Sequence, residues 1–237
     1  MTFALDALRI EVAEANAAID RAGLVTLSFG NVSGVDREAG VFVIKPSGAP
    51  YATLRPEDLV VVSLSDGRVV EGGKRPSVDT PTHRVLYEAF PGIGGVVHTH
   101  SPYASAWAQA GRPIPCFGTT HADFFRGDVP VTRQLRADEL GDGYEEDTGR
   151  VIVETLEGAG RSAIEAPAVL VASHGPFVWG SNATAAVETA IALEAIAAMA
   201  FRTLAIEAAT SEITEELVAR HFDRKHGAGA YYGQPRD

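Results

Sequence analysis

The chain has 237 residues, of which 46% are hydrophobic and 22% are charged, the balance of an ordinary globular protein. That length suits one large α/β domain, although length alone would also allow two. Its 20 Lys and Arg residues against 31 Asp and Glu residues give a formal net charge of −11, which argues against nucleic acid or an anionic membrane as the main partner. A small phosphorylated substrate stays compatible with this charge, because a few local donors can hold one phosphate.

Cysteine content and the first residues favour a cytoplasmic location. Cys116 is the single cysteine, so no internal disulfide can form and a zinc site built from several cysteines is excluded. The segment 1–6 has neither a basic region nor a long apolar run, and we therefore expect no signal peptide. The most apolar segment, 183–209, carries Glu188 and Glu194, which predicts a buried helix and not a membrane span.

The elements expected in the first half of the chain follow from apolar periodicity and turn residues. Apolar residues recurring every three to four positions predict a helix over 4–21. Asp66-Gly67 predicts a hairpin turn, and Thr80 followed by Pro81 predicts the start of a helix. In chain order we then expect a strand at 24–29, a turn at 30–34, strands at 41–45, 59–64 and 68–71, a helix at 81–90, a strand ending at the histidines of 94–100, and a helix at 103–109.

The elements expected in the second half of the chain follow from the same signals. Segment 114–133 should be irregular with short strands, and Asp147-Thr148 can begin a helix that ends near Gly158, although Val151 to Val153 would also suit a strand. A strand at 168–172, a long alanine-rich helix from Asn182 and a last helix at 214–225 follow. No repeat or linker divides the chain. We therefore predict a single α/β (α+β) domain with a mainly antiparallel sheet between helices.

The strongest chemical signal is the pair His98 and His100 at the end of the apolar run 94–97. Side chains alternate faces along a strand, so both histidines point the same way, about 6.6–6.8 Å apart along the chain. At that separation two imidazoles can bind one ion at about 2.0–2.1 Å each, as around zinc. The alternative is a turn histidine with a solvated neighbour. His174 follows a second apolar strand, and three histidines from two strand ends favour a three-ligand catalytic metal site.

Other polar segments allow two interpretations each. Asp79 either caps the helix that follows it or is a carboxylate at the metal site, and Ser77 near that helix start would suit an anion. Segment 45–48, Lys-Pro-Ser-Gly, is either a strand end with a β-turn or a phosphate cradle. Asp123 stands in a polar loop and gains a role only if it faces the metal. The adjacent tyrosines at 231–232 suggest that the Gly- and Ala-rich tail docks on something.

Several familiar motifs are excluded. The glycines of 92–95 lack the third glycine of a dinucleotide fingerprint and precede a strand. Segment 67–74 does not have phosphate-loop spacing, and the chain has no Gly-x-Ser-x-Gly elbow of a serine hydrolase. The remaining histidines show no ligand pattern, and we expect most of them at the surface: His83, His121, His221 and His226.

In this order the motifs resemble the sugar-phosphate 4-epimerases of the class II aldolase and epimerase family, nearly end to end. The matching segments are 24–27 with 30–33, 41–48, 79–84, 97–101, 118–123, 173–177 and 224–234. The resemblance implies a class II aldolase-like domain over 1–237, with a central sheet flanked by helices. It also implies a cyclic homotetramer with active sites at subunit interfaces, where the tail 227–237 docks.

The same resemblance implies roles for individual residues. It implies a divalent metal, usually Zn²⁺ although Mn²⁺ or Co²⁺ would also fit, bound by His98, His100 and His174 with Asp79 as the nearby carboxylate. The positions implied to hold the substrate phosphate are Asn31, Lys45, Ser47, Gly48, Ser77 and, through its backbone, Val78. The implied acid/base pair is Asp123 and Tyr232, and the residues implied to support the pocket are Thr119, Glu145 and His221.

The implied substrate is a small phosphorylated ketose, L-ribulose 5-phosphate, which is converted to D-xylulose 5-phosphate. C4 carries no acidic hydrogen, so its inversion cannot proceed by simple deprotonation. The resemblance implies instead that the C3–C4 bond breaks, the glycolaldehyde phosphate rotates, and the bond re-forms on the other face. The metal would act as a Lewis acid, and a proton-transfer group is needed on each side of the substrate.

One position departs from the epimerase pattern, because Val78 stands where those enzymes usually carry a second serine. Losing one hydroxyl donor would weaken substrate binding by about 0.5–1.5 kcal/mol, or roughly 2- to 13-fold. One alternative is an aldolase of the same family acting on a deoxy-ketose phosphate, but those enzymes resemble this chain with a glutamate in place of Asp79. The other alternative is a non-catalytic adaptor of the same fold, which would lack the metal histidines.

Overall fold

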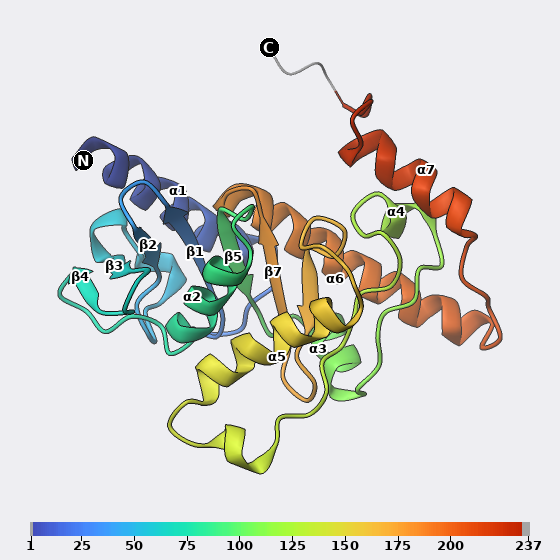
Figure 1. Ribbon diagram of the computed structural model, residues 1–237, viewed down its shortest axis with the longest axis horizontal. Helices are drawn as coiled ribbons and strands as arrows, with labels where there is room; N and C mark the ends of the chain where they lie inside the picture. The colour runs from blue at the N-terminus through green and yellow to red at the C-terminus, as the bar shows by residue number, and fades with distance from the viewer. Residues whose placement is uncertain (1, 234–237) are drawn as a thin grey trace.

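Seven strands form one sheet in the computed structural model, which describes residues 2–233 (Figure 1). The strands are β1 (Asn31–Asp36), β2 (Val41–Ile44), β3 (Val60–Ser63), β4 (Val69–Glu71), β5 (Gly95–His98), β6 (Ala168–Leu170) and β7 (Pro176–Gly180). Their order across the sheet is β4-β3-β2-β1-β5-β7-β6, and each neighbouring pair is antiparallel. The predicted α/β fold with a mainly antiparallel sheet is confirmed.

Helices cover both faces of the sheet. One face carries α1 (Thr2–Arg21), α3 (Pro102–Gln109) and α6 (Ala183–Ile206), and the other carries α2 (Thr80–Ala89) and α5 (Tyr144–Gly158). The short α4 (Thr119–Ala122) packs against the last helix, α7 (Glu215–His226), at the end of the molecule far from β4 (Figure 1). Three 3₁₀ turns complete the described chain: η1 (Tyr51–Thr53), η2 (Pro56–Asp58) and η3 (Ala137–Leu140).

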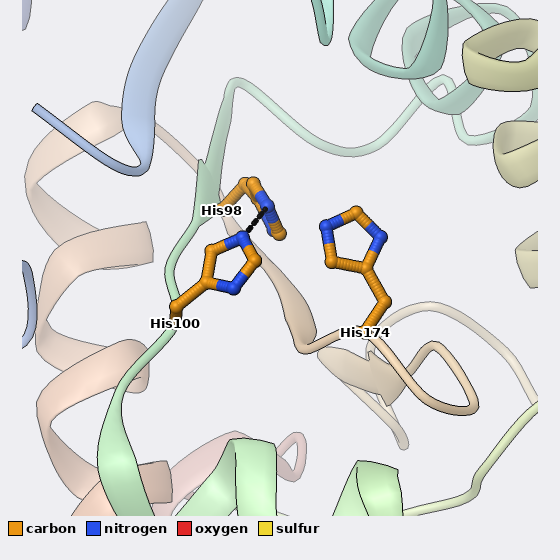
Figure 2. A group of neighbouring side chains, drawn as sticks. All are labelled: His98, His100 and His174. Carbon is orange, nitrogen blue, oxygen red and sulfur yellow. Dashed lines mark hydrogen bonds between the residues drawn. The ribbon is translucent and has the colours of Figure 1, made fainter.

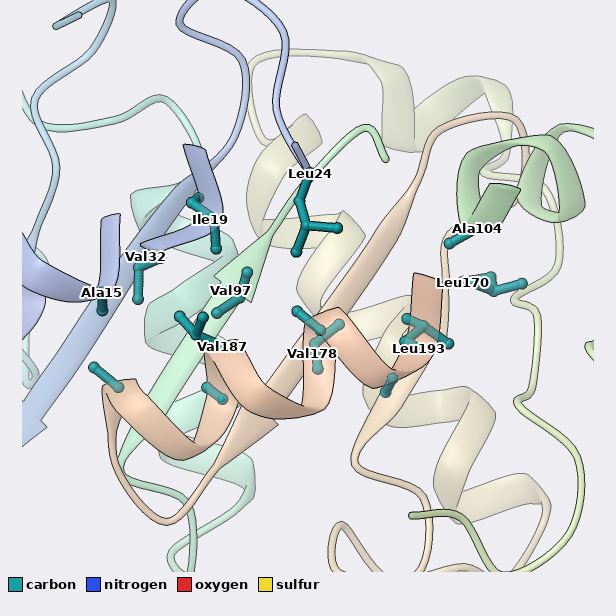
Figure 3. Packing of buried hydrophobic residues seen from close by; sticks show 14 of the residues in the cluster. Ala15, Ile19, Leu24, Val32, Val97, Ala104, Leu170, Val178, Val187 and Leu193 are labelled. Carbon is teal, nitrogen blue, oxygen red and sulfur yellow. The ribbon is translucent and has the colours of Figure 1, made fainter. Parts of the chain in front are cut away.

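The alternation of side chains along the strands creates two apolar clusters. On β5, Val97 packs in the cluster under α1 and α6, whereas Val96 packs in the cluster under α2 and α5. Figure 3 shows the first cluster, in which Val97 of the sheet lies beside Val187 of α6, with Val178 of β7 and Leu193 of α6 further along the same helix. Because β5 is buried on both faces, it holds the position of the histidine at its end firmly.

By length and composition α6 could span a membrane, and it is the one such helix among residues 2–233. A core helix of a globular protein meets the same criteria, so composition alone does not make α6 a membrane span. One side of α6 packs on the sheet and α1, and its Glu194 accepts hydrogen bonds from two backbone N–H groups at the start of α3 (2.8 and 3.0 Å). Its other side leaves Ile191, Met199 and Phe201 exposed.

The sequence prediction is wrong over 24–34. Segment 24–29 is not a strand but a series of turns, in which Leu27 has a φ of 57° and is 80% exposed. The strand β1 begins instead at Asn31, inside the segment expected to be a turn. Pairing with β2 and β5, and not local β-propensity, decides where this strand lies.

The other expected helices and strands are confirmed, with ends that differ by a few residues. The helix expected from Asp147 begins earlier, at Tyr144, and the strand alternative for this segment is wrong. Strand β7 was not predicted, because Pro176 suggests a turn, but proline is tolerated as the first residue of a strand. Residues 234–237 of the tail expected to dock lie outside the described residues.

The crossing of β5 under the start of α6 requires a glycine. A Cβ atom at Gly95 would lie 2.5 Å from backbone atoms of Asn182 and Ala183. The Gly95→Ala variant should therefore lose about 1–3 kcal/mol of unfolding free energy, the usual cost of overpacking, as measured by chemical denaturation. Gly73, which has nothing within 4 Å of its Cβ position, is the control, and Gly73→Ala should unfold like the native protein. Equal stability of the two variants would contradict the constraint.

Candidate metal centre and substrate pocket

Strand pairing brings Asn31, His98 and Phe177 into one row across β1, β5 and β7. Asn31 lies opposite His98 in the β1–β5 pair, and His98 lies opposite Phe177 in the β5–β7 pair. The His98 ring stacks on the Phe177 ring with the two centroids 4.2 Å apart. The sheet register therefore sets the orientation of this imidazole.

Three histidines converge beyond the end of β5 (Figure 2). The Nε2 atoms of His98 and His100 are 3.2 Å apart, and one ring nitrogen from each of His98, His100 and His174 lies within 4.8 Å of the others. Figure 2 shows a ring nitrogen of His174 turned toward the other two rings. Two ligands bound at about 2.0–2.1 Å to a tetrahedral ion are roughly 3.3–3.4 Å apart, so this spacing fits a metal site.

Two of the three rings, His98 and His174, have a polar partner on the side away from the centre of the triad. The Pro176 carbonyl can only accept, so Nδ1 of His98 donates to it at 3.0 Å and Nε2 of His98 carries the lone pair. The Tyr144 hydroxyl lies 3.3 Å from Nδ1 of His174. Burial and the neighbouring His98 lower the pKa of His174 to about 4, and the same two causes lower the pKa of His100. Neutral imidazoles held by partners on their outer nitrogens are the form that binds metal ions.

Asp79 lies beside the triad and does not cap α2 with its side chain. It occupies the N-cap position, but the carboxylate makes no capping hydrogen bond, so that interpretation of Asp79 is wrong. Its Oδ2 atom accepts hydrogen bonds from Asn31 Nδ2 at 2.6 Å and from Ser77 Oγ at 3.4 Å. Asn31 Nδ2 also donates to Ser77 Oγ at 3.0 Å. The three side chains form one connected polar wall.

A pocket of about 460 Å³ opens beside the histidines and this wall. It collects the metal-site positions and all the positions that the family resemblance implies for the phosphate, which are distant in sequence. The residues lining it include His98, His100, His174, Asp79, Asn31, Lys45, Ser47, Gly48, Ser77, Val78 and Glu145.

Lys45 brings a buried positive charge to the pocket. Its side chain is 2% exposed, and its ammonium lies 4.7 Å from the centroid of the Tyr51 ring and 3.3 Å from the Ser28 carbonyl oxygen. Burial lowers the pKa of Lys45 to about 8, although the nearby Asp79 opposes the shift. In contrast, Val78 presents an apolar side chain, 62% exposed, to the same pocket.

The residues implied in proton transfer lie elsewhere on the chain. Among the described residues that line the pocket, Asp123, Thr119, His221 and Tyr232 do not occur. They gather instead where α4 meets α7 and the segment after it, and His221 Nδ1 lies 3.1 Å from Asp123 Oδ1. The chain therefore carries two separate groups of polar residues.

Some residues at the pocket carry no sequence signal, and two histidines lie where their sequence context does not predict them. The sequence predicts no role for Tyr144 or Tyr51. The one signal for Tyr144 is that it directly precedes Glu145, a position to which the family resemblance assigns a role in the pocket. His83 and His121 were expected at the surface, but they are 0% and 4% exposed. For His83 this prediction is wrong because it lies on the apolar face of α2, one helical turn from the buried Tyr87.

Comparison with known proteins identifies the family. The sequence profile described as the class II aldolase and adducin N-terminal domain matches residues 10–201, and this chain belongs to that family. The L-ribulose-5-phosphate 4-epimerases UlaF of Salmonella paratyphi C (strain RKS4594) and Salmonella typhi are 52% and 51% identical to it over 227 residues, 96% of this chain and 98% of theirs.

Solved structures share the fold. An L-fuculose 1-phosphate aldolase superposes with a TM-score of 0.77 at 24% identity, over 90% of this chain and 94% of that one, which shows a common fold alone. YgbL from Klebsiella pneumoniae, a proposed aldolase/epimerase/decarboxylase, is 30% identical with a TM-score of 0.73, over 91% of this chain and 98% of its own.

Removing one histidine of the triad should abolish tight metal binding. We expect His98→Asn to lower the affinity for Zn²⁺ by more than about 100-fold. Losing a residue that only hydrogen-bonds to a metal ligand already lowers metal affinity about 10- to 100-fold, and His98 would be a ligand itself. Equilibrium dialysis followed by metal analysis measures this affinity. His226→Asn, on α7, is the matched control and should bind Zn²⁺ like the native protein. Native affinity in His98→Asn would contradict a metal centre at the triad.

The buried Lys45 ammonium makes anion binding in the pocket depend on pH. The charge is present below pH 8 and is lost as the pH rises through about 8, because the pKa is lowered to about 8. The dissociation constant of inorganic phosphate, measured by calorimetry, should therefore rise above pH 8 by up to roughly tenfold per pH unit. In Lys45→Met, binding should be weak and independent of pH in this range. A pH-independent constant for the native protein between pH 7 and 10 would refute the prediction.

Proposed function

We propose that this protein is a metal-dependent 4-epimerase that interconverts L-ribulose 5-phosphate and D-xylulose 5-phosphate. The observation that carries the proposal is the clustering of three histidines and a buried lysine around one pocket of about 460 Å³. The three histidines can hold a metal ion that contacts the oxygen atoms of a ketose, and the lysine ammonium can bind a phosphate. The 52% identity to a protein named L-ribulose-5-phosphate 4-epimerase supports this substrate over other phosphorylated ketoses.

His98, His100 and His174 would hold the cation, which we take to be Zn²⁺ because three imidazoles with an open position suit catalytic zinc. A bound cation would supply Lewis-acid stabilisation of the negative charge that develops on the ketose as C3–C4 breaks. The phosphate would be held by Asn31, Lys45, Ser47, Gly48, Ser77 and the backbone of Val78. The pocket wall formed by Asp79 borders the reacting end of the substrate.

Proton transfer is assigned to Asp123 and Tyr232. The C4 hydroxyl must lose a proton when C3–C4 breaks, and the aldehyde oxygen must gain one when the bond re-forms on the opposite face, so two groups are needed. Because neither residue lines the pocket of its own subunit, a neighbouring subunit would bring them to it. Thr119 and His221 would come with them, whereas Glu145 would support the pocket from the subunit that forms it. A cyclic homotetramer meets this requirement, and the exposed apolar residues of α6 supply surface for subunit contact.

The alternative functions have less support. A class II aldolase acting on a deoxy-ketose phosphate would require a longer carboxylate at position 79, whereas Asp79 is short and its Oδ2 atom is held by Asn31 at 2.6 Å. A non-catalytic adaptor would not need the intact triad. The acidic chain, its small-molecule pocket and its lone buried thiol, Cys116, support a cytoplasmic enzyme with neither nucleic acid nor membrane as partner.

A product assay tests the proposed activity. Zn²⁺-loaded native protein given L-ribulose 5-phosphate should form D-xylulose 5-phosphate, and His98→Asn should lower kcat by at least about 1,000-fold, since charge stabilisation at the breaking bond is the largest expected contribution. Coupled enzymatic detection of xylulose 5-phosphate measures the rate. No turnover by metal-loaded native protein would rule out L-ribulose 5-phosphate as the substrate, and deoxy-ketose phosphates would then be the compounds to examine.

Subunit sharing of the site predicts complementation between two inactive variants. His98→Asn lacks the metal site and Asp123→Asn lacks the proton-transfer group, so each alone should keep only a small residual activity. After mixing, unfolding and refolding together, random assembly of a cyclic oligomer should restore about a quarter of native activity, because one interface in four carries both intact groups. Refolding each variant alone is the control. Absence of any recovery in a mixed oligomer would place both groups in one subunit.

A further inference from the structure

The carboxylate of Asp123 is held by side chains of α7. Nε and Nη2 of Arg224 donate to Oδ1 and Oδ2 of Asp123 at 2.9 and 2.7 Å, a two-point fork, and His221 Nδ1 lies 3.1 Å from Oδ1. His226 Nε2 lies 2.9 Å from the backbone oxygen of Asp123. A guanidinium that meets both oxygens of a carboxylate fixes its plane as well as its charge.

The same arginine also holds the segment that carries Tyr232. The backbone oxygen of Arg224 accepts hydrogen bonds from the N–H groups of Tyr231 and Tyr232, at 2.9 and 3.1 Å. The guanidinium carbon lies 4.9 Å from the centroid of the Tyr232 ring. Lys225, the next residue, places its ammonium 5.2 Å from that centroid and 3.7 Å from the centroid of Phe124. Arg224 thus contacts both proposed proton-transfer groups through different atoms.

We propose that Arg224 is a positioning residue that joins Asp123 and Tyr232 into one unit, holding the carboxylate ionised and oriented with its side chain and the tyrosine with its backbone and guanidinium face. This inference rests on the proposed function, since it takes Asp123 and Tyr232 to be the acid/base pair. It adds a residue to which the family resemblance gave no role.

The two carboxylate oxygens of Asp123 differ in their hydrogen bonds. Oδ1 of Asp123 faces two donors, whereas Oδ2 meets only Arg224 among the described residues and keeps a lone pair for a substrate proton. Partial burial opposes the charge on Asp123, but the hydrogen bonds from Arg224 and His221 bring its pKa below the usual value. The carboxylate can therefore take the C4 hydroxyl proton while the Tyr232 hydroxyl gives a proton to the aldehyde oxygen on recapture. Solvent then returns both groups to their starting states.

A lysine could not replace this arginine. An ammonium is a single point of charge, so it would keep the positive charge beside Asp123 but could not donate to both oxygens in one plane. We therefore expect Arg224→Lys and Arg224→Ala to lower kcat by roughly 100-fold, the effect of a small misplacement of a reacting group, and to leave KM within about threefold. Metal content and oligomeric state should stay native. Arg220→Lys, an exposed position one turn earlier on α7, is the matched control and should keep native kcat.

Two further measurements separate positioning from a merely structural role. Guanidinium ion added to Arg224→Ala should restore part of kcat, whereas sodium chloride at equal ionic strength should not. In the Asp123→Asn background, Arg224→Ala should lower kcat by much less than it does in the native protein, because only its contact with Tyr232 is left to lose. Loss of kcat that guanidinium does not rescue and that adds fully to Asp123→Asn would overturn the proposal.

A readout without turnover keeps this test independent of the proposed function. In protein with ¹³C-labelled aspartate, the carboxyl resonance of Asp123, assigned with Asp123→Asn, should titrate at a pKa below the usual aspartate value. In Arg224→Ala that pKa should move up toward the usual value. A native protein that does not turn over the pentulose phosphate would defeat the proposed function, whereas an Asp123 titration unchanged by Arg224→Ala would overturn the role of Arg224.

Discussion

The pairing of β5 with β1 on one side and β7 on the other is the constraint on which the site depends. This register sets His98 opposite Asn31 and Phe177, so one ring is fixed by backbone hydrogen bonds of three strands. The turn before β7 then returns His174 to the same place, and the carbonyl of Pro176 on β7 accepts the outer N–H of His98. A shift of one residue in this pairing would turn His98 to the opposite face and dismantle the triad.

Burial and charge are distributed so that each polar group has a distinct state. The chain is strongly acidic, yet the pocket sets the buried ammonium of Lys45 beside the three imidazoles and the carboxylate of Asp79. At α4 and α7, in contrast, the carboxylate of Asp123 is surrounded by hydrogen-bond donors. The residues proposed to bind the metal and the phosphate and those proposed to transfer protons thus lie on different elements of one chain. Their separation is the physical reason for proposing that two subunits complete each site.

Local patterns in the sequence predict those parts of the fold that depend on periodicity and caps. The long helices and the strands β2, β3 and β5 follow from apolar spacing, and Asn182 and Thr214 cap α6 and α7 as their residue types predict. The prediction for segment 24–34 is wrong. Its β-branched residues suggest a strand at 24–29, but this part forms turns, and the strand that pairs in the sheet begins at Asn31. The burial of His83 was also missed, because a histidine gives no sign of the face on which it will pack.

The site was predictable in part. The His-x-His spacing and a third histidine after a strand indicate a metal centre without any relative, and the structure brings their ring nitrogens together. Lys45, Asn31 and Ser77 lie in the same pocket as the histidines because distant segments of the chain pack together. The spacing of residues along the sequence does not predict such contacts. The proposed roles of Asp123 and Tyr232 come from family resemblance alone. The contacts of Arg224 with the Asp123 carboxylate and the Tyr232 ring join distant parts of the sequence, and only the structure shows them.

The most direct test of carbon–carbon bond cleavage is the position of deuterium in the product. The Zn²⁺-loaded protein would convert L-ribulose 5-phosphate in D₂O, and the D-xylulose 5-phosphate formed would be examined by NMR. Inversion by breaking and re-forming C3–C4 predicts that the hydrogen on C4 is retained, because that hydrogen never leaves its carbon. Deuterium at C4 would show that the proton itself is removed and replaced, and would contradict the proposed chemistry.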